Sequence, residues 1–292
     1  MEPVFVFGAA HWDLLAQPAR TPLPGADLQG RIVQRPGGVA LNIAAGLARA
    51  GMACELVAAI GRDAEGETLV SLIETLGVGS HYMRRTRFTD RYVAIERPDG
   101  QLFGAVADCR ALEAVGMGLF DLPQHPGPAG QPPRATLSVL DGNLAPQIAG
   151  RIADYPALCD RVALVSASPS KAPQLRCLVE RLAQLPSIRD LTLFVNLLEA
   201  EAICGARFSD SLAAARALCA WTAQAVVTDG PRPAALATAA GLSHTAQPTA
   251  TIARSTLGAG DSFAAGFLAA RLTGTADAEA WFLAGFAAAA RQ

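Results

Sequence analysis

The chain has 292 residues, of which 51% are hydrophobic and 6% aromatic, and a formal net charge of −2. This length suits one large α/β domain, and the charge argues against a nucleic-acid polymer as partner. No apolar stretch is long enough to cross a bilayer, so we expect no membrane partner. The six cysteines include no C-x-x-C pair, which fits a cytoplasmic protein, and the four histidines form no zinc pattern.

Short aliphatic or β-branched runs alternate with Ala- and Leu-rich segments of helical length along most of the chain. The expected strands are Val4–Phe7, Leu56–Ile60, Leu137–Leu140, Ala163–Val165, Leu191–Val195 and Ala225–Thr228. The expected helices are Val39–Ala50, Glu67–Leu76, Leu144–Tyr155, Ala172–Gln184 and Leu212–Trp221. This order predicts an α/β fold with a mainly parallel central sheet flanked by helices.

Two extended, polar-rich segments interrupt the alternation, near residues 13–35 and 84–106. Within the second, residues 91–103 alternate on both sides of a Pro-Asp-Gly turn, which indicates a hairpin. The two segments together predict a small β lid that projects from the main body. Because the chain contains no internal repeat and no linker, we expect residues 1–292 to form a single domain carrying this lid. The exposed edges of the lid strands predict a homodimer.

A glycine-rich turn near the end of the chain is the first candidate for chemistry. Gly258-Ala259-Gly260-Asp261 precedes a long apolar segment. The glycines permit a tight turn, and the first N–H groups of a following helix would bind a phosphate. Asp261 could accept a proton from an attacking hydroxyl. Taken alone, however, the motif favours a helix N-cap role for Asp261.

The signatures of P-loop proteins, protein kinases and classical dinucleotide-binding folds do not occur in the sequence. A P-loop requires Gly-Lys-Ser/Thr, but the only lysine, Lys171, is followed by Ala172. No His-Arg-Asp or Asp-Phe-Gly motif occurs, and no G-x-G-x-x-G follows the first strand. A P-loop is therefore excluded, and neither a protein kinase nor a classical dinucleotide-binding fold is supported.

Five motifs, in order along nearly the whole chain, resemble those of the PfkB carbohydrate kinase family. They are R-P-G-G-V-A-L-N-I-A at 35–44, A-I-G-R-D-A-E-G at 59–66, N-L-L-E-A-E at 196–201, V-V-T-D-G at 226–230 and G-A-G-D at 258–261. The resemblance implies a ribokinase-like fold. It also implies an ATP- and Mg²⁺-dependent phosphotransferase with an alcohol acceptor, acting on a small-molecule sugar or nucleoside.

The resemblance implies a catalytic role for the glycine-rich turn. Asp261 would be the catalytic base, and the backbone of Gly258, Ala259 and Gly260 would form the anion hole for the transferred phosphoryl group. Ser255 stands where the family usually has an aspartate that helps hold a monovalent cation. This departure argues against activation by potassium.

A second group of residues would serve the nucleotide. Asn196 and Glu199 would organise magnesium and its waters, with Glu199 acting on the metal through water. The same two residues could equally be a helix N-cap and an acid in the first helical turn. Thr228 and Gly230 would line the ATP site, although an ordinary exit from a strand into a turn explains them as well.

The acceptor would bind near the beginning of the chain. By resemblance, Gly37, Gly38 and Asn42 would contact the substrate. Asp13 matches the family's N-x-D position after the first strand, where His11 replaces the usual Asn. A carboxylate at that place could accept hydrogen bonds from two vicinal hydroxyls, although Asp13 could also be a polar turn residue.

The identity of the acceptor is indicated by three segments, at residues 104–109, 140–144 and 196–201, which look similar to the pseudouridine kinase branch. We therefore expect phosphorylation of pseudouridine at its 5′ hydroxyl. A simple sugar (ribose, a ketohexose or a 2-keto-3-deoxy sugar acid) is the alternative acceptor, and a non-catalytic sugar- or nucleoside-binding protein is the alternative class. Asn143 follows a strand end and could contact the substrate or cap the next helix.

Overall fold

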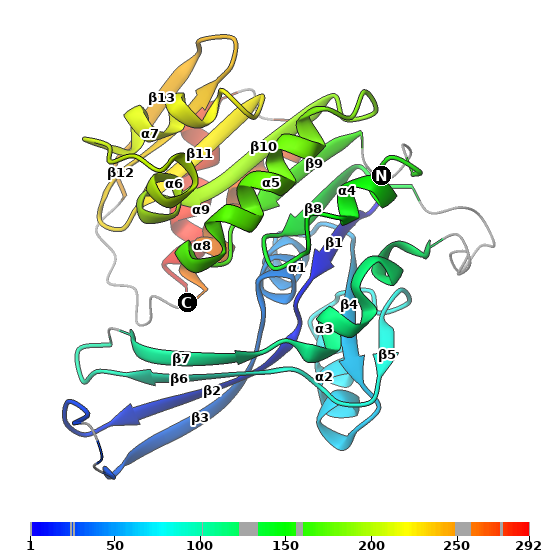
Figure 1. The fold of residues 1–292 in the computed structure, drawn as a ribbon, viewed down its shortest axis with the longest axis vertical. Helices are drawn as coiled ribbons and strands as arrows, with labels where there is room; N and C mark the ends of the chain where they lie inside the picture. The colour runs from blue at the N-terminus through cyan, green and yellow to red at the C-terminus, as the bar shows by residue number, and fades with distance from the viewer. Residues whose placement is uncertain are drawn as a thin grey trace.

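The computed structural model describes residues 2–23, 25, 27–100, 102–122, 134–155, 160–248, 258–274 and 277–291. These residues form a nine-stranded main sheet, with helices on both faces, and a separate four-stranded sheet that projects from it (Figure 1). The predicted α/β architecture, a mainly parallel sheet flanked by helices with a small projecting sheet, is confirmed. None of the helices in the described residues combines the length and the apolar character that a bilayer crossing requires.

The main sheet has the strand order β13-β12-β11-β10-β9-β8-β1-β4-β5. Its strands are β1 (Val4–Gly8), β4 (Cys54–Gly61), β5 (Arg84–Thr86), β8 (Leu137–Asp141), β9 (Arg161–Val165), β10 (Asp190–Asn196), β11 (Gln224–Asp229), β12 (Arg232–Thr238) and β13 (Ser243–Ala246). The strands from β5 to β11 are parallel, whereas β12 and β13 pair antiparallel at one edge. The carboxyl ends of the parallel strands therefore share one edge.

Helices cover both faces of this sheet because its central strands are apolar on both sides. In β1, Phe5 and Phe7 point into one core, and Val4 and Val6 point into the other. The first core is closed by α3 (Arg110–Val115), η1 (Gly116–Phe120), α4 (Ile148–Ile152), α5 (Ala172–Ala183), α6 (Leu197–Cys204) and α7 (Ser211–Leu218). The short helix η3 (Pro169–Lys171) precedes α5 and has no buried residue. The second is closed by α1 (Val39–Arg49), α2 (Ala64–Thr75), α8 (Ala259–Leu272) and α9 (Ala278–Ala289).

The projecting sheet has the order β3-β2-β6-β7 and is called the lid sheet below. Its strands are β2 (His11–Pro18), β3 (Gly30–Gly37), β6 (Arg91–Glu96) and β7 (Leu102–Asp108). The expected hairpin is present as the antiparallel pair β6–β7. Residues 84–86, which were expected in the lid, instead form β5 beside β4 in the main sheet. Their run of three residues is too short to distinguish the two sheets by alternation.

Two further differences from the sequence expectation have local causes. The helix expected over residues 144–155 is only Ile148–Ile152, because Pro146 offers no N–H and Gly150 disfavours the helical state. Strands β12 and β13 were not expected. Alanine, which has low strand propensity, dominates β12, and Pro233 lies within it.

Candidate active site

Residues from the carboxyl ends of several parallel strands meet at one edge of the main sheet. Asn196 ends β10, and its register partner in β11 is Thr228. At the end of β8, the Asp141 carboxylate accepts a hydrogen bond of 2.8 Å from the backbone N–H of Ala9, just after β1. This is also the edge from which the lid sheet departs, since β2 begins at His11.

Asp261 lies in the first turn of α8, which begins after Gly258. Gly258 has a left-handed backbone with φ of 79°, so a glycine is favoured there. The Asn42 side-chain N–H donates to Asp261 Oδ2 over 2.8 Å, which joins α1 to α8. The two helices pack closely enough that a Cβ on Gly46 would lie 2.5 Å from the Cβ of Ala265. Two motifs from opposite ends of the sequence are thus brought into direct contact.

The Asp261 carboxyl has an unusual affinity for protons. Burial raises its pKa to about 7, against the opposing hydrogen bond from Asn42, and the nearby carboxylates of Asp141, Glu199 and Asp13 add to the rise. A carboxyl with this pKa can accept a proton near neutral pH, which a general base must do. The electrostatic coupling also indicates that the four acidic groups face a common region.

The amino end of α8 places, beside Asp261, backbone N–H groups that have no partner within the helix. The first N–H groups of a helix have no partner within it and carry its positive dipole end. Gly260 is exposed, and no described atom lies within 4 Å of the position that a Cβ would take there. Glycine is therefore not required at residue 260 by packing. The missing side chain instead leaves the backbone open to a ligand.

The Asp13 side chain on the lid sheet is closely packed against its neighbours. It is 4% exposed, and a Cβ on Gly37 would lie 2.2 Å from its Oδ1, so only glycine fits at residue 37. His11 Nδ1 lies 3.1 Å from Asp13 Oδ1, and Arg35 Nε lies 3.6 Å from Oδ2. The carboxylate is therefore fixed between two nitrogen groups, beside the predicted acceptor residues.

Gly38 forms the junction between β3 and α1. Its φ is 103°, and a Cβ would lie 2.4 Å from the carbonyl oxygen of Ala9. The same carbonyl accepts a hydrogen bond of 3.3 Å from the Leu41 N–H. Gly38 thus lets the start of α1, which carries Asn42, approach the end of β1.

Asp141, the last residue of β8, is a central residue of this edge. It is 1% exposed, and its Oδ1 accepts 2.8 Å hydrogen bonds from both the backbone and the side-chain N–H groups of Asn143. Burial raises the pKa of Asp141, while Ala9, Asn143 and the charge of Lys171 oppose the rise. The Asn143 amide is therefore engaged by protein groups, and its predicted contact with substrate stays a prediction.

Asn196 and Glu199 form a reciprocal cap at the start of α6. Glu199 N–H donates to Asn196 Oδ1 over 2.9 Å, and Asn196 N–H donates to Glu199 Oε2 over 2.8 Å. The helix-cap role is therefore present. Glu199 is also 6% exposed, and burial raises the pKa of its carboxyl. Gly230, with φ of 57°, turns the chain just after Thr228 and β11.

The donor groups at this edge fit a magnesium ion that keeps most of its waters. In the described residues, no three His, Cys, Asp or Glu side chains form a cluster that could hold a metal by themselves. A single buried carboxylate such as Glu199 matches the way Mg²⁺ is bound through water and substrate phosphates. Ser255, on which the expectation about a monovalent cation depends, lies outside the described residues.

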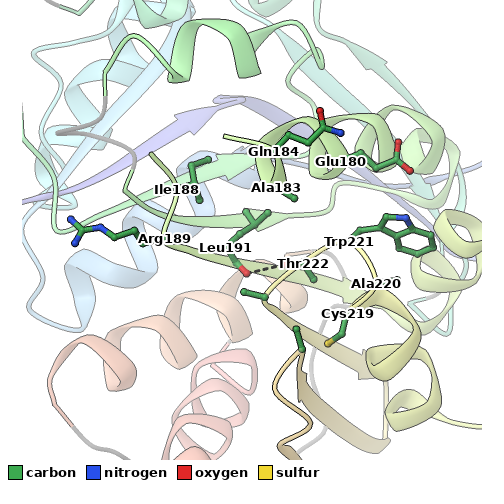
Figure 2. Close-up of a pocket in the computed structure, with 12 residues that line it drawn as sticks. Glu180, Ala183, Gln184, Ile188, Arg189, Leu191, Cys219, Ala220, Trp221 and Thr222 are labelled. Atoms are coloured by element: carbon green, nitrogen blue, oxygen red, sulfur yellow. Dashed lines mark hydrogen bonds between the residues drawn. The ribbon is translucent and has the colours of Figure 1, made fainter. Parts of the chain in front are cut away.

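A separate pocket lies at the opposite edge of the sheet (Figure 2). It is lined by residues such as Glu180, Trp221 and Leu191, and the Thr222 hydroxyl donates to the Leu191 carbonyl there over 2.8 Å. Leu191 is near the amino end of β10, whereas Asn196 is at its carboxyl end. This pocket contains none of the predicted site residues.

The chain is similar in fold to solved structures of carbohydrate and nucleoside kinases. A carbohydrate kinase from Agrobacterium tumefaciens is 26% identical, with a TM-score of 0.72, covering 99% of this chain and 90% of that one. An Arabidopsis thaliana ribokinase complexed with ribose and ATP is 21% identical with a TM-score of 0.75, covering 99% and 92%. The adenosine kinase from Sinorhizobium meliloti is 20% identical with a TM-score of 0.75, also covering 99% and 92%. No curated protein sequence matches the chain.

The model of the pfkB family of carbohydrate kinases matches residues 1–102 and 162–292. The chain therefore belongs to the pfkB family, and it is a carbohydrate or nucleoside kinase. Residues 103–161 lie outside the matched segments, and they include Asp141 and Asn143.

Proposed function

We propose that this kinase transfers the γ-phosphoryl group of ATP to the 5′ hydroxyl of pseudouridine, with Asp261 as the general base. The hydrogen bond of 2.8 Å between Asn42 and Asp261 carries the proposal. It joins the acceptor motif on α1 to the glycine-rich motif on α8, so that an acceptor bound by one is presented to the other. A helix cap alone would not need this contact.

The proposed reaction uses groups with defined positions. The acceptor hydroxyl lies between Asp13 and Asp261, and its proton passes to the Asp261 carboxylate. Its oxygen bonds to the γ-phosphorus as the bond from that phosphorus to the ADP oxygen breaks. The N–H groups at the start of α8 stabilise the negative charge on the transferred group. Magnesium near Glu199, when bound, would neutralise phosphate charge.

ATP is supported as the phosphate donor by the similar Arabidopsis ribokinase, whose structure contains ribose and ATP. In this chain, the nucleotide would bind along the ends of β10 and β11. There Asn196 and Thr228 are register partners and Gly230 follows in a turn. Glu199, one helical turn away, would act on magnesium through water.

The acceptor is proposed from two kinds of observation. Segments 104–109, 140–144 and 196–201 look similar to the pseudouridine kinase branch. In addition, the rings of His11 and Tyr92 stack with centroids 6.1 Å apart and an angle of 27°. Tyr92 is the register partner of Asp13 on the lid sheet, so the stacked pair offers a flat surface for a nucleobase beside the acceptor carboxylate. Ribose remains the second candidate because of the ribose-bound ribokinase relative.

The test is a coupled ADP-release assay with ATP and Mg²⁺. The acceptors are pseudouridine, uridine, ribose, a ketohexose and a 2-keto-3-deoxy sugar acid. We expect the highest kcat/KM for pseudouridine. A higher value for a simple sugar would replace the acceptor but leave the kinase class intact. Tight binding without turnover of any acceptor would support the non-catalytic alternative and contradict the proposal.

We also propose a homodimer formed through the outer face of the lid sheet. Ile32, Val93, Ile95 and Val106 are 74%, 41%, 39% and 70% exposed. The strand register places all four on one face, opposite to Asp13. Burying such a face against a second copy would remove it from water. Light scattering should give twice the monomer mass, and Val106→Glu should shift it toward the monomer.

A further inference from the structure

The only lysine of the chain occupies an unusual position. Lys171 ends η3, immediately before α5, and is partly buried. Its Nζ donates a hydrogen bond of 2.7 Å to Asn143 Oδ1. Within the part of the chain that the structure describes, this is the one hydrogen bond of the ammonium group, which forms no ion pair. An ammonium has three donors, so two of them remain available to a ligand.

A chain of contacts connects this lysine to the reacting end of the site. Asn143 accepts from Lys171 and donates to Asp141, whose other oxygen accepts from Ala9 N–H. Asp141 in turn raises the pKa of Asp261 electrostatically. Lys171 therefore lies on the same edge as the proposed base, separated from it by Asn143 and Asp141.

The lysine also lies close to the base of the lid. Burial raises the pKa of the Cys109 thiol, and the positive charge of Lys171 opposes that rise more than any other group does. Cys109 directly follows β7, which ends at Asp108. Lys171 is thus placed between the end of β8 and the base of the lid sheet. An acceptor that extends away from Asp261 toward the lid base would meet it.

The position of the ammonium is fixed by a rigid loop. Asn143 is held by two hydrogen bonds to Asp141, and the Gln174 side chain donates to the carbonyl of Leu144 over 2.7 Å. A donor held in this way loses little freedom when a ligand binds. The Asn143 amide, whose oxygen and nitrogen both have protein partners, orients the lysine.

We propose that Lys171, oriented by Asn143, is an acceptor-binding residue that donates hydrogen bonds to a carbonyl or carboxylate oxygen at the end of the acceptor remote from the phosphorylated hydroxyl. The inference rests on the proposed kinase function and narrows its substrate class. A nucleobase with ring carbonyls or a sugar acid would use this donor, whereas ribose has neither group. Asn143 lies in residues 103–161, outside the segments matched by the family model, whereas Lys171 lies within the matched segment 162–292.

Kinetics of Lys171→Met test the proposal, with pseudouridine, a 2-keto-3-deoxy sugar acid and ribose as acceptors. Loss of a charge-assisted hydrogen bond should raise KM for the nucleoside or the acid roughly 10- to 100-fold. The KM for ribose and the kcat values should change little, and Lys171→Arg should restore most of the affinity. If the KM for pseudouridine rises, Lys171 binds a ring carbonyl oxygen. If the KM for the sugar acid rises, Lys171 binds a carboxylate oxygen. Equal changes for all three acceptors, or no change, would overturn the proposal.

Arg176→Met is the matched control because Arg176 lies on the same helix but pairs with Glu180 at 2.9 Å and covers the Trp221 ring. It should alter no acceptor KM. A second measurement uses the unmodified protein. Acetylation by an amine-reactive ester can label only Lys171 and the terminal amine, and peptide mass spectrometry separates them. Pseudouridine or the sugar acid should protect Lys171, and ribose should not. Equal protection by all acceptors, or protection by none, would overturn the proposal even if turnover were undetectable.

Discussion

Replacing Asp261 by Asn should have opposite effects on activity and on stability. The raised pKa of about 7, against an ordinary value of 3.8, means that the folded protein holds the proton more tightly than the unfolded chain does. Between these pH values folding takes up a proton, so the free energy of unfolding falls as pH rises. Well above pH 7 the Asp261 carboxyl is ionised in the folded protein, and the free energy of unfolding is then lowered by the whole cost of that ionisation.

The size of the effect follows from the pKa. A shift of about 3 pH units at 1.36 kcal/mol per unit gives about 4 kcal/mol as an upper bound. Because the side chain is partly exposed, we expect about 1–3 kcal/mol of added stability in Asp261→Asn at pH 8. The gain should shrink toward zero near pH 4, where Asp261 is protonated in the folded protein. Urea unfolding at several pH values measures it.

Turnover should respond in the other direction. A general base contributes about 10²- to 10⁴-fold, so the variant should lose at least two orders of magnitude in kcat while its acceptor affinity stays close to wild type. In the unmodified enzyme, kcat/KM should rise with pH around 7, because only the ionised carboxylate accepts the proton. A variant that retains more than about a tenth of the activity would refute the assignment of the base.

Asp210→Asn is the control for the stability arm. Hydrogen bonds from Ala213 and Ser209 hold the pKa of the Asp210 carboxyl below its usual range at the start of α7. Its contribution to stability is therefore present above the unfolded pKa and is lost as pH falls. The same substitution should give no gain at pH 8, and any difference should narrow toward low pH. A stability gain in Asp261→Asn that is independent of pH would contradict the reasoning.

Three further predictions use other parts of the structure. Gly37→Ala would push a methyl group against the Asp13 carboxylate, so KM for the acceptor should rise about tenfold or more while KM for ATP does not. Glu199→Gln keeps the cap at the start of α6 and should raise the Mg²⁺ concentration needed for half-maximal activity about 10-fold, with the melting temperature nearly unchanged. Arg271→Met removes the 2.9 Å hydrogen bond to Asp190 and should lower the free energy of unfolding by about 1–3 kcal/mol without changing either KM.

The parallel core could be predicted because its strands are short apolar runs between helical segments, as in Val4–Phe7. Residues 84–86 were expected to be extended, but three residues could not show that they pair with β4 rather than with the lid. β12 was not predicted, because its alanine-rich run around Pro233 lacks a strand pattern. The Asn42–Asp261 contact spans 219 positions, and only a family resemblance suggested that the two belong together.

The importance of Lys171 was missed for a different reason. From the sequence, Lys171 shows only that the chain has no P-loop. A lysine at the start of a helix looks like any other solvated charge, so nothing in the sequence indicates a binding role. What distinguishes it is the lack of an ion-pair partner among the described residues and its hydrogen bond to Asn143. Neither property can be read from residue type or spacing, since both depend on where the ends of β8 and β9 lie in the sheet.

The proposed base and the proposed acceptor-binding lysine lie on different elements of the site. Asp261 and Asn42 lie on α8 and α1, which pack directly against each other within the segments matched by the family model. Asp141 and Asn143, which orient Lys171, lie in the unmatched residues 103–161. Lys171 itself lies within the matched segment 162–292. Because Asn143 and Asp141 separate it from Asp261, we expect a substitution at residue 143 or 171 to change what binds at the far end of the acceptor without moving the base. We accordingly expect acceptor preference and catalytic rate to vary independently among variants of this edge, as the contrast between Lys171→Met and Asp261→Asn will measure.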